Sequence, residues 1–449
     1  MDLESRFEKA AAAESSKGRR GSKGRRGDGG KSALSIPQFY FPGGQPLEAE
    51  DLEREKKAIG DAFGRAASGR LGLDQFAGLV QQLSFSRYMA TLLFNRIDSG
   101  NTGYVRYTEV MEYWETHLKD SDEHKRVFDL LVHSGRERPE VPGEPRGPVD
   151  RLVRKSFRSW LDVVVASHPG LEFLRGSDEF QARYIQMVIA RIFFVVNRTW
   201  SQAISLREFR GSNMVGDIRA LDDEPDINKH LRFFSYEHFY ITYIAYWELD
   251  TDHDLVISKA DLTRYESYAL TYRILDRVFA MLSASGAPPD SMSFDDFVVF
   301  YLAEQDKSSD PAIEYWFRCI DSDGDGKISI YEMEFLFQEQ IYRMSCLNLE
   351  EIPFDDLLCQ LIDLVKPRNP TYITLSDLKR CGQAPIFFNA LFNLNKFFNY
   401  EQKDPGTIRA EHGEPHLTPW DRFAREEYER LSIEEDDYDD GGDVGGGRW

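Results

Sequence analysis

The sequence predicts a mostly α-helical chain, built as an elongated array of helix-loop-helix units that pair through short β-bridges. From Asp51 onward, apolar residues recur at spacings of three and four, which is the period of amphipathic helices. One acidic segment has the residue spacing of a calcium-binding loop between two helices. Polar loops of similar shape recur, and those that begin near residues 250, 285 and 321 lie about 35 residues apart, as tandem units should.

The acidic segment runs from Asp321 to Glu332 with the sequence D-S-D-G-D-G-K-I-S-I-Y-E. It matches the calcium loop of an EF-hand, in which oxygen ligands occupy alternate positions and a Glu closes the site at position twelve. Gly326 stands where the loop must turn sharply, and Ile328 stands where an EF-hand forms a short strand with a second hand. We expect calcium to be held by six residues, the fourth through its backbone carbonyl: Asp321, Asp323, Asp325, Lys327, Ser329 and Glu332.

Taken in order, the chain begins with residues 1–34, which we expect to be a disordered basic tail. The stretch from Lys17 to Gly27 is rich in Lys, Arg and Gly and has nothing to bury. Two interpretations of it stay open, a nuclear-localisation or anionic-surface patch and a solubilising tail. A hydrophobic motif follows at Ile36 to Pro42, where three aromatic residues lie between prolines that prevent a helix. This motif either plugs a groove in its own fold or docks on a partner.

Residues 35–148 are expected to hold that motif and a degenerate EF-hand-like pair. The pair consists of a loop that ends at Arg70 to Phe76 and a loop from Asp98 to Glu109. The second loop has Gly100 and Thr102 where calcium needs oxygen-rich side chains, so we expect a structural hand rather than a metal site. The Pro- and Gly-rich segment from Ser134 to Pro148 predicts a connection or a domain boundary.

Residues 149–240 are expected to form a helical EF-hand-like region. It contains a loop from Asn197 to Glu208 and a second loop that ends at Phe234 to Phe239. Residues 241–305 are expected to form the first calcium-competent hand, together with a pseudo-hand whose loop ends at Met292 to Phe297. We expect the hands that lack carboxylates to pair with a neighbour and complete its β-bridge.

The first calcium-competent loop, from Asp250 to Asp261, departs from the pattern twice. Leu255 replaces the turn glycine, at a cost on the order of 1–2 kcal/mol for a left-handed backbone. Asp261 replaces the closing Glu and is one methylene shorter. A pseudo-hand held by hydrogen bonds is the alternative, but three alternating Asp residues would repel one another without a cation. We therefore expect calcium ligands at Asp250, Asp252, Asp254, Val256, Ser258 and Asp261.

Residues 306–432 are expected to form the second EF-hand, a pseudo-hand and the C-terminal helices. The second hand carries the Asp321 loop, and its pseudo-hand ends at Tyr372 to Leu378. Residues 433–449 are expected to be a disordered tail, first acidic from Glu434 to Asp440 and then rich in Gly.

Composition narrows the choice of partners and compartment. The net charge of −21 argues against nucleic acid or an acidic membrane and favours a basic partner surface or divalent cations. The four cysteines have no C-x-x-C spacing and are expected to be reduced core thiols of a cytoplasmic or nuclear protein. No apolar leader begins the chain, and no apolar run is long enough to span a membrane.

No catalytic motif stands out, so we expect the protein not to be an enzyme. The phosphate-binding G-x-x-x-x-G-K-[ST], the zinc-binding H-E-x-x-H, the hydrolase G-x-S-x-G and the kinase signatures are all missing from the sequence. His238 and His253 lie in or near loops and are expected to be polar surface residues rather than ligands.

Several long runs together resemble one family, the B-double-prime regulatory subunits of protein phosphatase 2A. The resemblance extends from about Ile36 to Leu431, is dense from His168 to Phe423, and is poor over residues 43–150. The runs that carry it are Ile36–Pro42, Thr199–Ser201, Phe234–Tyr240, Tyr246–Leu255, Glu314–Cys319, Asp363–Pro367 and Trp420–Ala424. The family shares the Leu and Asp departures of the Asp250 loop, which supports calcium there.

The resemblance implies a non-catalytic role in a phosphatase holoenzyme. Members of this family bind the scaffold subunit and the catalytic subunit, select phosphoprotein substrates, and assemble under the control of calcium. An alternative is a calcium-responsive EF-hand adaptor or buffer without a phosphatase partner. The nine Met residues are dispersed, which counts against a Met-rich groove of the calmodulin type.

Overall fold

A computed structural model describes residues 47–66, 68–135, 151–401 and 417–440. The chain divides into the units Met1–Pro42 and Gly43–Trp449, and every described element belongs to the second. The predictions for the basic tail, for the Ile36 to Pro42 motif and for the Gly-rich end fall outside the described residues.

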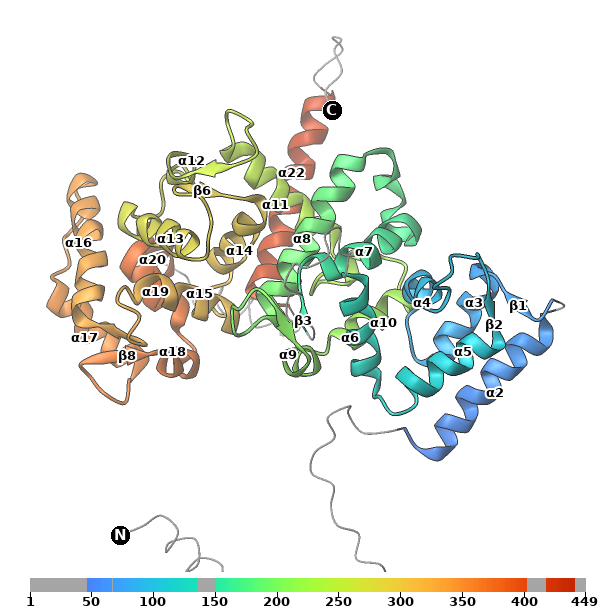
Figure 1. The fold of residues 1–449 in the computed structure, drawn as a ribbon. Coiled ribbons are helices and arrows are strands. Elements are labelled where there is room, and N and C mark those ends of the chain that lie inside the picture. The colour runs from blue at the N-terminus through green and yellow to red at the C-terminus, as the bar shows by residue number, and fades with distance from the viewer. Residues whose placement is uncertain (1–46, 67, 136–150, 402–416, 441–449) are drawn as a thin grey trace, which may run out of the picture. The chain divides into compact units, whose positions relative to one another are not determined.

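Helix-loop-helix units joined two by two confirm the predicted fold class (Figure 1). Each pair is joined by a two-stranded antiparallel sheet, and the described residues contain four such sheets. In each sheet one buried apolar residue faces another across the strands: Leu71 and Val105, Leu152 and Ile204, Ile257 and Met292, Ile328 and Ile373. The prediction that Ile328 belongs to a strand shared with a second hand is therefore confirmed.

The first two pairs occupy the N-terminal half of the described chain. The first contains α2 (Ala49–Arg65), β1 (Arg70–Leu71), α3 (Leu73–Val80), η1 (Gln81–Leu83), η2 (Arg87–Met89), α4 (Ala90–Ile97), β2 (Val105–Arg106), α5 (Tyr107–Tyr113) and η3 (Trp114–Leu118). The second contains α6 (Glu123–Ser134), β3 (Arg151–Leu152), α7 (Lys155–Ser167), η4 (Pro169–Gly176), α8 (Asp178–Val196), β4 (Ile204–Ser205), α9 (Leu206–Gly211), α10 (Met214–Asp223) and η5 (Ile227–Lys229).

The two pairs that carry the acidic loops follow, and then the C-terminal helices. The third pair contains α11 (Tyr236–Leu249), β5 (Ile257–Ser258), α12 (Lys259–Thr263), α13 (Tyr272–Ala284), β6 (Ser291–Met292) and α14 (Phe294–Gln305). The fourth contains α15 (Asp310–Ile320), β7 (Lys327–Ser329), α16 (Ile330–Cys346), α17 (Phe354–Val365), β8 (Tyr372–Thr374) and α18 (Leu375–Cys381). The remaining helices are α19 (Ala384–Phe392), α20 (Leu394–Glu401) and α22 (Pro419–Asp440).

A capping box starts the helix that leaves most of these loops. A Ser or Thr hydroxyl accepts a hydrogen bond from the N–H three residues later, and the acid at that position accepts bonds from the Ser or Thr. The pairs are Ser205 and Glu208, Ser258 and Asp261, Ser293 and Asp296, Ser329 and Glu332, Thr374 and Asp377. The acidic residue that closes each of these loops thus also belongs to the capping box of its exit helix.

The prediction of a loop that ends at Phe234 to Phe239 is wrong. The strand that pairs with the Asn197 to Glu208 loop is Arg151–Leu152, which precedes that loop in the chain. Ser235 instead caps the N-terminus of α11, where its hydroxyl accepts from the N–H of His238. An N-cap Ser followed by an acid and a Phe is common at the start of helices, so this pattern does not by itself indicate an EF-hand loop.

For the segment from Ser134 to Pro148, the packing of the elements on either side supports a connection rather than a domain boundary. Helix α6 contacts α7 and α9. The Ser134 hydroxyl donates to the carbonyl of Ser156 at 2.8 Å, and a Cβ added at Gly135 would lie 2.5 Å from Ser156 Oγ. Helices α6 and α7 therefore form one degenerate hand, joined by residues 136–150, which lie outside the described residues.

Helix α22 continues to Asp440, past residue 433, where we expected a disordered tail. Arg430 pairs with Glu427 and Glu434, three and four residues away on the same helix, and such pairs favour helix. Near its start Trp420 is buried, and its Nε1–H donates to His238 Nδ1 at 3.1 Å. The contact fixes α22 against α11, and it shows that His238 is a core residue rather than the polar surface residue we expected.

The cysteines are only partly as expected. All four are free thiols. Cys319 is buried, as predicted for a core thiol, and Cys381 is half-buried. Cys346 and Cys359 are exposed, so the prediction of core thiols is wrong for these two. None of the helices in the described part of the chain combines the length and the apolar character that a bilayer crossing requires.

Candidate calcium-binding site

Three carboxylates gather where helix α15 ends. One oxygen from each of Asp321, Asp323 and Asp325 lies within 4.8 Å of the others. Gly324 and Gly326 adopt φ values of 72° and 81°, which glycine reaches without the clash that a Cβ would cause. These two turns fold the loop, residues 321–332 (the Asp321 loop), around the carboxylate cluster.

Backbone N–H groups orient these carboxylates. Gly326 N–H donates to Asp321 Oδ2 at 3.0 Å, and Asp325 N–H donates to Asp321 Oδ1 at 3.1 Å. Lys327 N–H donates to Asp325 Oδ1 at 2.8 Å. The loop is therefore shaped by its own main chain before any ligand is considered.

Glu332 closes the far side of the Asp321 loop. Its Oε1 accepts from the N–H and the hydroxyl of Ser322, at 2.6 and 2.8 Å. Its Oε2 accepts from the N–H and the hydroxyl of Ser329, at 2.8 and 2.9 Å. Burial works to raise the pKa of Glu332, but the hydrogen bonds from Ser329 and Ser322 hold it below its usual value. The carboxylate is thus kept ionised and within its loop.

The pKa of Asp321 is shifted in the opposite direction, mainly by burial. Burial, and then the negative charges of Glu332 and Asp325, raise the pKa of Asp321, although N–H donors from Gly326 and Gly324 partly oppose them. The ionised cluster is therefore unfavourable by itself. A divalent cation would remove that penalty, and a set made only of oxygen atoms is what calcium prefers. The donor set of the Asp321 loop fits calcium.

The loop from residue 250 to residue 261 (the Asp250 loop) repeats this arrangement. One oxygen from each of Asp250, Asp252 and Asp254 lies within 4.8 Å of the others. Asp250 is fully buried and accepts from Leu255 N–H at 2.9 Å and from Asp254 N–H at 3.2 Å. Val256 N–H donates to Asp254 Oδ1 at 2.8 Å, as Lys327 does in the other loop. Burial raises the pKa of Asp250.

Leu255 takes the left-handed conformation that the missing glycine would have taken. Its φ is 66°, close to that of Gly326, and its side chain is 42% exposed. The backbone strain is therefore real, and little burial of the side chain offsets it. The loop keeps its shape in spite of the substitution.

The closing residue is where the two loops differ most. Asp261 Oδ2 accepts from Ser258 N–H at 2.9 Å, but its Oδ1 accepts from Arg264 at 2.7 Å instead of reaching across the loop. Arg264 also donates to Leu249 O at 2.8 Å and to Thr251 Oγ1 at 3.1 Å. A guanidinium thus holds the residue that should close the site. Burial works to raise the pKa of Asp261, but the hydrogen bonds from Ser258 and Arg264 hold it below its usual value.

Arg264 is the residue of this site that sequence reasoning missed. The signal that could have found it is an Arg three residues after the closing Asp, because the metal-free hand at Asp377 has the same pair. There Arg380 forms an ion pair with Asp377. The corresponding residue after Glu332 is Phe335. The Asp250 loop therefore combines the carboxylates of a calcium loop with the closing pair of a pseudo-hand.

The remaining hands hold their loops with hydrogen bonds. In the Asn197 loop, Glu208 Oε1 accepts from Asn197 Nδ2 at 3.2 Å and from Thr199 N–H at 3.0 Å. In the Asp98 loop, Asp98 accepts from Thr102 N–H at 2.9 Å and from Gly103 N–H at 2.7 Å. The two clusters already described are the only groups of three metal-ligating side chains within the described ranges.

The other predicted ligands lie on the second half of each loop. Ser258 and Ser329 cap the exit helices, and Val256 and Lys327 each follow the third carboxylate. The structure brings together the first three predicted ligands of each loop. The fourth to sixth are Val256, Ser258 and Asp261 in one loop and Lys327, Ser329 and Glu332 in the other. All six residues of each loop stay predictions as calcium ligands.

Comparison with known protein families finds EF-hands in this chain. A family described as an EF-hand domain matches residues 122–224, and one described as an EF-hand domain pair matches residues 242–338. The first match spans α6 to α10 and so includes the segment from Ser134 to Pro148. The second match includes the Asp250 loop and the Asp321 loop.

Curated relatives match nearly the whole chain. The probable B''epsilon regulatory subunit of serine/threonine protein phosphatase 2A from Arabidopsis thaliana is 42% identical over 405 residues, which are 89% of this chain and 74% of that protein. The delta member of the B'' regulatory subunits, from Mus musculus, is 40% identical over 421 residues, 91% of this chain and 83% of that protein. The alpha member, from Homo sapiens, is 40% identical over 408 residues, 90% of this chain and 34% of that protein.

A solved structure is similar as well. A chain described as a PP2A PR70 holoenzyme and labelled diCa is 46% identical to this chain. The match covers 62% of this chain and 98% of that chain, with a TM-score of 0.56.

Proposed function

The chain belongs to the B'' family of protein phosphatase 2A regulatory subunits, and from this premise we propose that calcium, held in its two acidic loops, controls its assembly with the scaffold and catalytic subunits. Its role is that of a regulator and not of an enzyme. The phosphatase chemistry belongs to the catalytic subunit, so we assign no catalytic residue in this chain.

One observation carries the calcium proposal. Each of two loops draws three carboxylate oxygens to within 4.8 Å of one another, and both loops raise the pKa of their first Asp. Bound calcium would supply the positive charge that compensates for bringing these buried and crowded carboxylates together. The residues that would hold it are Asp250, Asp252, Asp254, Val256, Ser258 and Asp261 in one loop, and Asp321, Asp323, Asp325, Lys327, Ser329 and Glu332 in the other.

The loops suit a regulatory role because of where they lie. Each connects two helices, and in EF-hand sensors calcium changes the angle between such helices. A change of that kind would alter the surface presented by α15 and α16 or by α11 and α12. The net charge of −21 favours basic surfaces on the partner, and charge complementarity speeds association and selects partners.

The proposal has two further parts, the substrates and the location of the protein. Phosphoprotein substrates, which this chain would select, follow from the family and not from a site in the structure. A cytoplasmic or nuclear location is supported by the four free thiols, since disulfides are rare in those compartments.

Co-purification from a cell lysate tests the proposal. The tagged full chain should recover the scaffold and catalytic subunits more strongly in calcium than in chelator, and Asp250→Ala/Asp321→Ala should remove that difference. Asp98→Asn, in a hand without a carboxylate cluster, is the matched control and should keep it. The alternative function, a calcium-responsive adaptor, would be supported if neither partner is recovered in either condition.

A further inference from the structure

The segment that follows the Asp250 hand has an unusual backbone. Residues 264–271 (the linker turn) connect α12 to α13, and three successive residues in it have left-handed φ values. These are 43° at Glu266, 56° at Ser267 and 67° at Tyr268. Residues other than glycine avoid this region, and a run of three persists only when the surrounding structure holds it in place.

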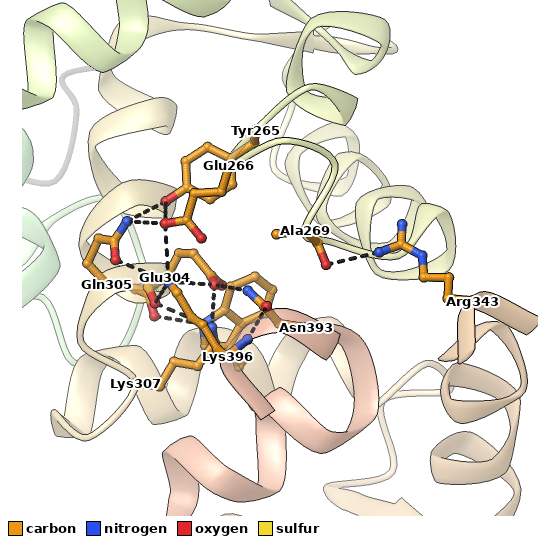
Figure 2. Close-up of polar contacts among 11 residues, drawn as sticks. Tyr265, Glu266, Ala269, Glu304, Gln305, Lys307, Arg343, Asn393 and Lys396 are labelled. Atoms are coloured by element: carbon orange, nitrogen blue, oxygen red, sulfur yellow. Dashed lines mark hydrogen bonds and ion pairs between the residues drawn. The ribbon is translucent and has the colours of Figure 1, made fainter. Parts of the chain in front are cut away.

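Helix α16, the exit helix of the Asp321 loop, holds the linker turn from one side. The Arg343 guanidinium donates to the carbonyl oxygens of Tyr268 and Ala269, at 3.0 Å each, and also to that of Leu270. Figure 2 shows the contact with Ala269. Three successive carbonyls therefore depend on one side chain. Arg343 is largely buried beside Glu339 of the same helix, so it has little freedom to move elsewhere.

A second set of contacts holds the turn from the other side. Gln305, at the end of α14, donates to Glu266 Oε1 and to the Tyr265 hydroxyl, at 2.7 Å each (Figure 2). Lys396 of α20 pairs with Glu266 at 3.3 Å and with the buried Glu304 at 3.1 Å. These contacts fix one end of the turn, while Arg343 fixes the other.

Helix α13, which follows the turn, is bound to both helices that flank the Asp321 loop. The Glu339 carboxylate of α16 accepts from the N–H groups of Tyr272 and Arg273, at 2.7 and 2.9 Å. Arg277 of α13 donates to the carbonyl of Cys319 in α15 at 2.9 Å. If the angle between α15 and α16 changes, α13 cannot keep both sets of contacts.

The N-terminal end of the linker turn contacts the Asp250 loop. Arg264 is the first residue of the linker turn, and it is the residue that donates to Asp261 Oδ1 and to Thr251 Oγ1. Hydrogen bonds thus attach one end of the linker turn to α16 and the other end to the closing residue of the Asp250 loop, and the backbone of the turn joins the two ends. A connection of this kind couples two sites when it joins elements that have two arrangements.

We propose that Arg343 is a positioning residue that couples the two loops, so that calcium in the Asp321 loop changes the affinity of the Asp250 loop for calcium, and the reverse. The inference rests on the proposed function, since it requires both loops to bind calcium. By thermodynamic linkage, the effect of each loop on the other is equal in size.

Calcium titration of the full chain by calorimetry measures this coupling. Asp321→Ala and Asp250→Ala give the constant of each loop alone, and the wild type gives the overall constant for two ions. The overall constant divided by the product of the single constants is the coupling factor. We expect a factor that differs from one by about fivefold or more with Arg343, as is typical of coupled sites, and a factor within about twofold of one when all three chains also carry Arg343→Gln.

Arg158→Gln is the matched control, because Arg158 is exposed and pairs only with Asp162 on its own helix. It should leave the coupling factor unchanged. A factor near one in the wild-type background, or the same factor with and without Arg343, would overturn the inference while leaving the proposed function intact. Absence of calcium binding in every chain would overturn both.

A second measurement does not depend on whether the Arg343→Gln chain folds. In Asp250→Ala only the Asp321 loop can fill, and calcium should then slow hydrogen exchange at the amides of the linker turn. The amides of β1 and β2 serve as the internal control. Unchanged exchange in the linker turn, with calcium bound at the Asp321 loop, would contradict the coupling.

Discussion

Glu332 spans the loop that it closes, because its Oε1 lies 2.6 Å from the N–H nitrogen of Ser322 at the opposite end. Asp261, at the same position of the other loop, is one methylene shorter and gives its Oδ1 to Arg264. The two loops gather their first three carboxylates in the same way and differ in how they close. Most of the expected differences in calcium binding follow from this contrast.

Asp321→Ala should remove one calcium site and leave the fold largely intact. The side chain supplies two of the oxygens around which the loop turns, but the neighbouring strand β7 and the core do not depend on it. Calorimetric titration should show the stoichiometry fall from two to one, with an unchanged far-ultraviolet circular dichroism spectrum. An unchanged stoichiometry would refute the assignment of this loop.

Exchanging the closing residues should change the two affinities in opposite directions. Asp261→Glu lengthens the side chain enough to compete with Arg264 and to reach across the loop, so calcium binding there should tighten by roughly tenfold. Glu332→Asp should weaken the other loop by a similar factor. Each substitution serves as the control for the other when both are measured in chains whose second loop is inactivated. Equal affinities before and after the exchange would show that the closing residue does not set them.

Leu255→Gly should stabilise the Asp250 loop. Leucine at a φ of 66° carries a steric penalty on the order of 1–2 kcal/mol. Glycine removes this penalty but loses more conformational entropy on folding, so the expected net gain in the free energy of unfolding is about 0.5–1 kcal/mol. The side chain is 42% exposed, so its removal costs little burial. Gly326→Leu should have the opposite effect in the other loop. Chemical denaturation in calcium measures both, and a destabilised Leu255→Gly chain would disagree with the strain described here.

His238 should make stability depend on pH. Burial first, and the charge of Arg191 second, hold the pKa of His238 well below its usual value. In the unfolded chain the group takes up a proton below about pH 6.5, whereas the folded chain does not, so unfolding becomes easier as the pH falls below that point. The Trp420 Nε1–H donates to Nδ1, and Nε2 faces Asp421, so the neutral ring is the one that fits.

The control for this prediction is His238→Phe, which keeps a ring but cannot be protonated. Thermal unfolding between pH 7.5 and pH 5 should show a smaller loss of stability in the variant than in the wild type. Parallel pH profiles for the two chains would show that His238 does not contribute.

The parts of the fold that could be predicted are those in which neighbouring residues decide the outcome. The Asp321 loop carries its ligands, its glycines and its capping box within twelve positions, and the strand of Ile328 follows from the same spacing. The Asp250 loop was recognised for the same reason, in spite of Leu255. Pairing of each loop with its neighbour also follows wherever the two loops are near in the chain.

Prediction failed where the partner lies far away or the signal is shared. The strand that pairs with Ile204 lies at Leu152, across a segment rich in Pro and Gly that suggested a boundary. Ser235 carries a helix-start signal that loops and isolated helices have in common. The hydrogen bonds from Arg343 to the linker turn depend on tertiary packing, which periodicity and motifs do not reveal.

The central claim is that calcium in these two loops controls assembly with the phosphatase. The most direct measurement is the affinity of the purified full chain for the purified scaffold subunit, with free calcium as the only variable. Calcium should tighten the dissociation constant by roughly tenfold or more, which is about 1.4 kcal/mol, and Asp250→Ala/Asp321→Ala should abolish the change. A dissociation constant that is the same in calcium and in chelator would contradict the account.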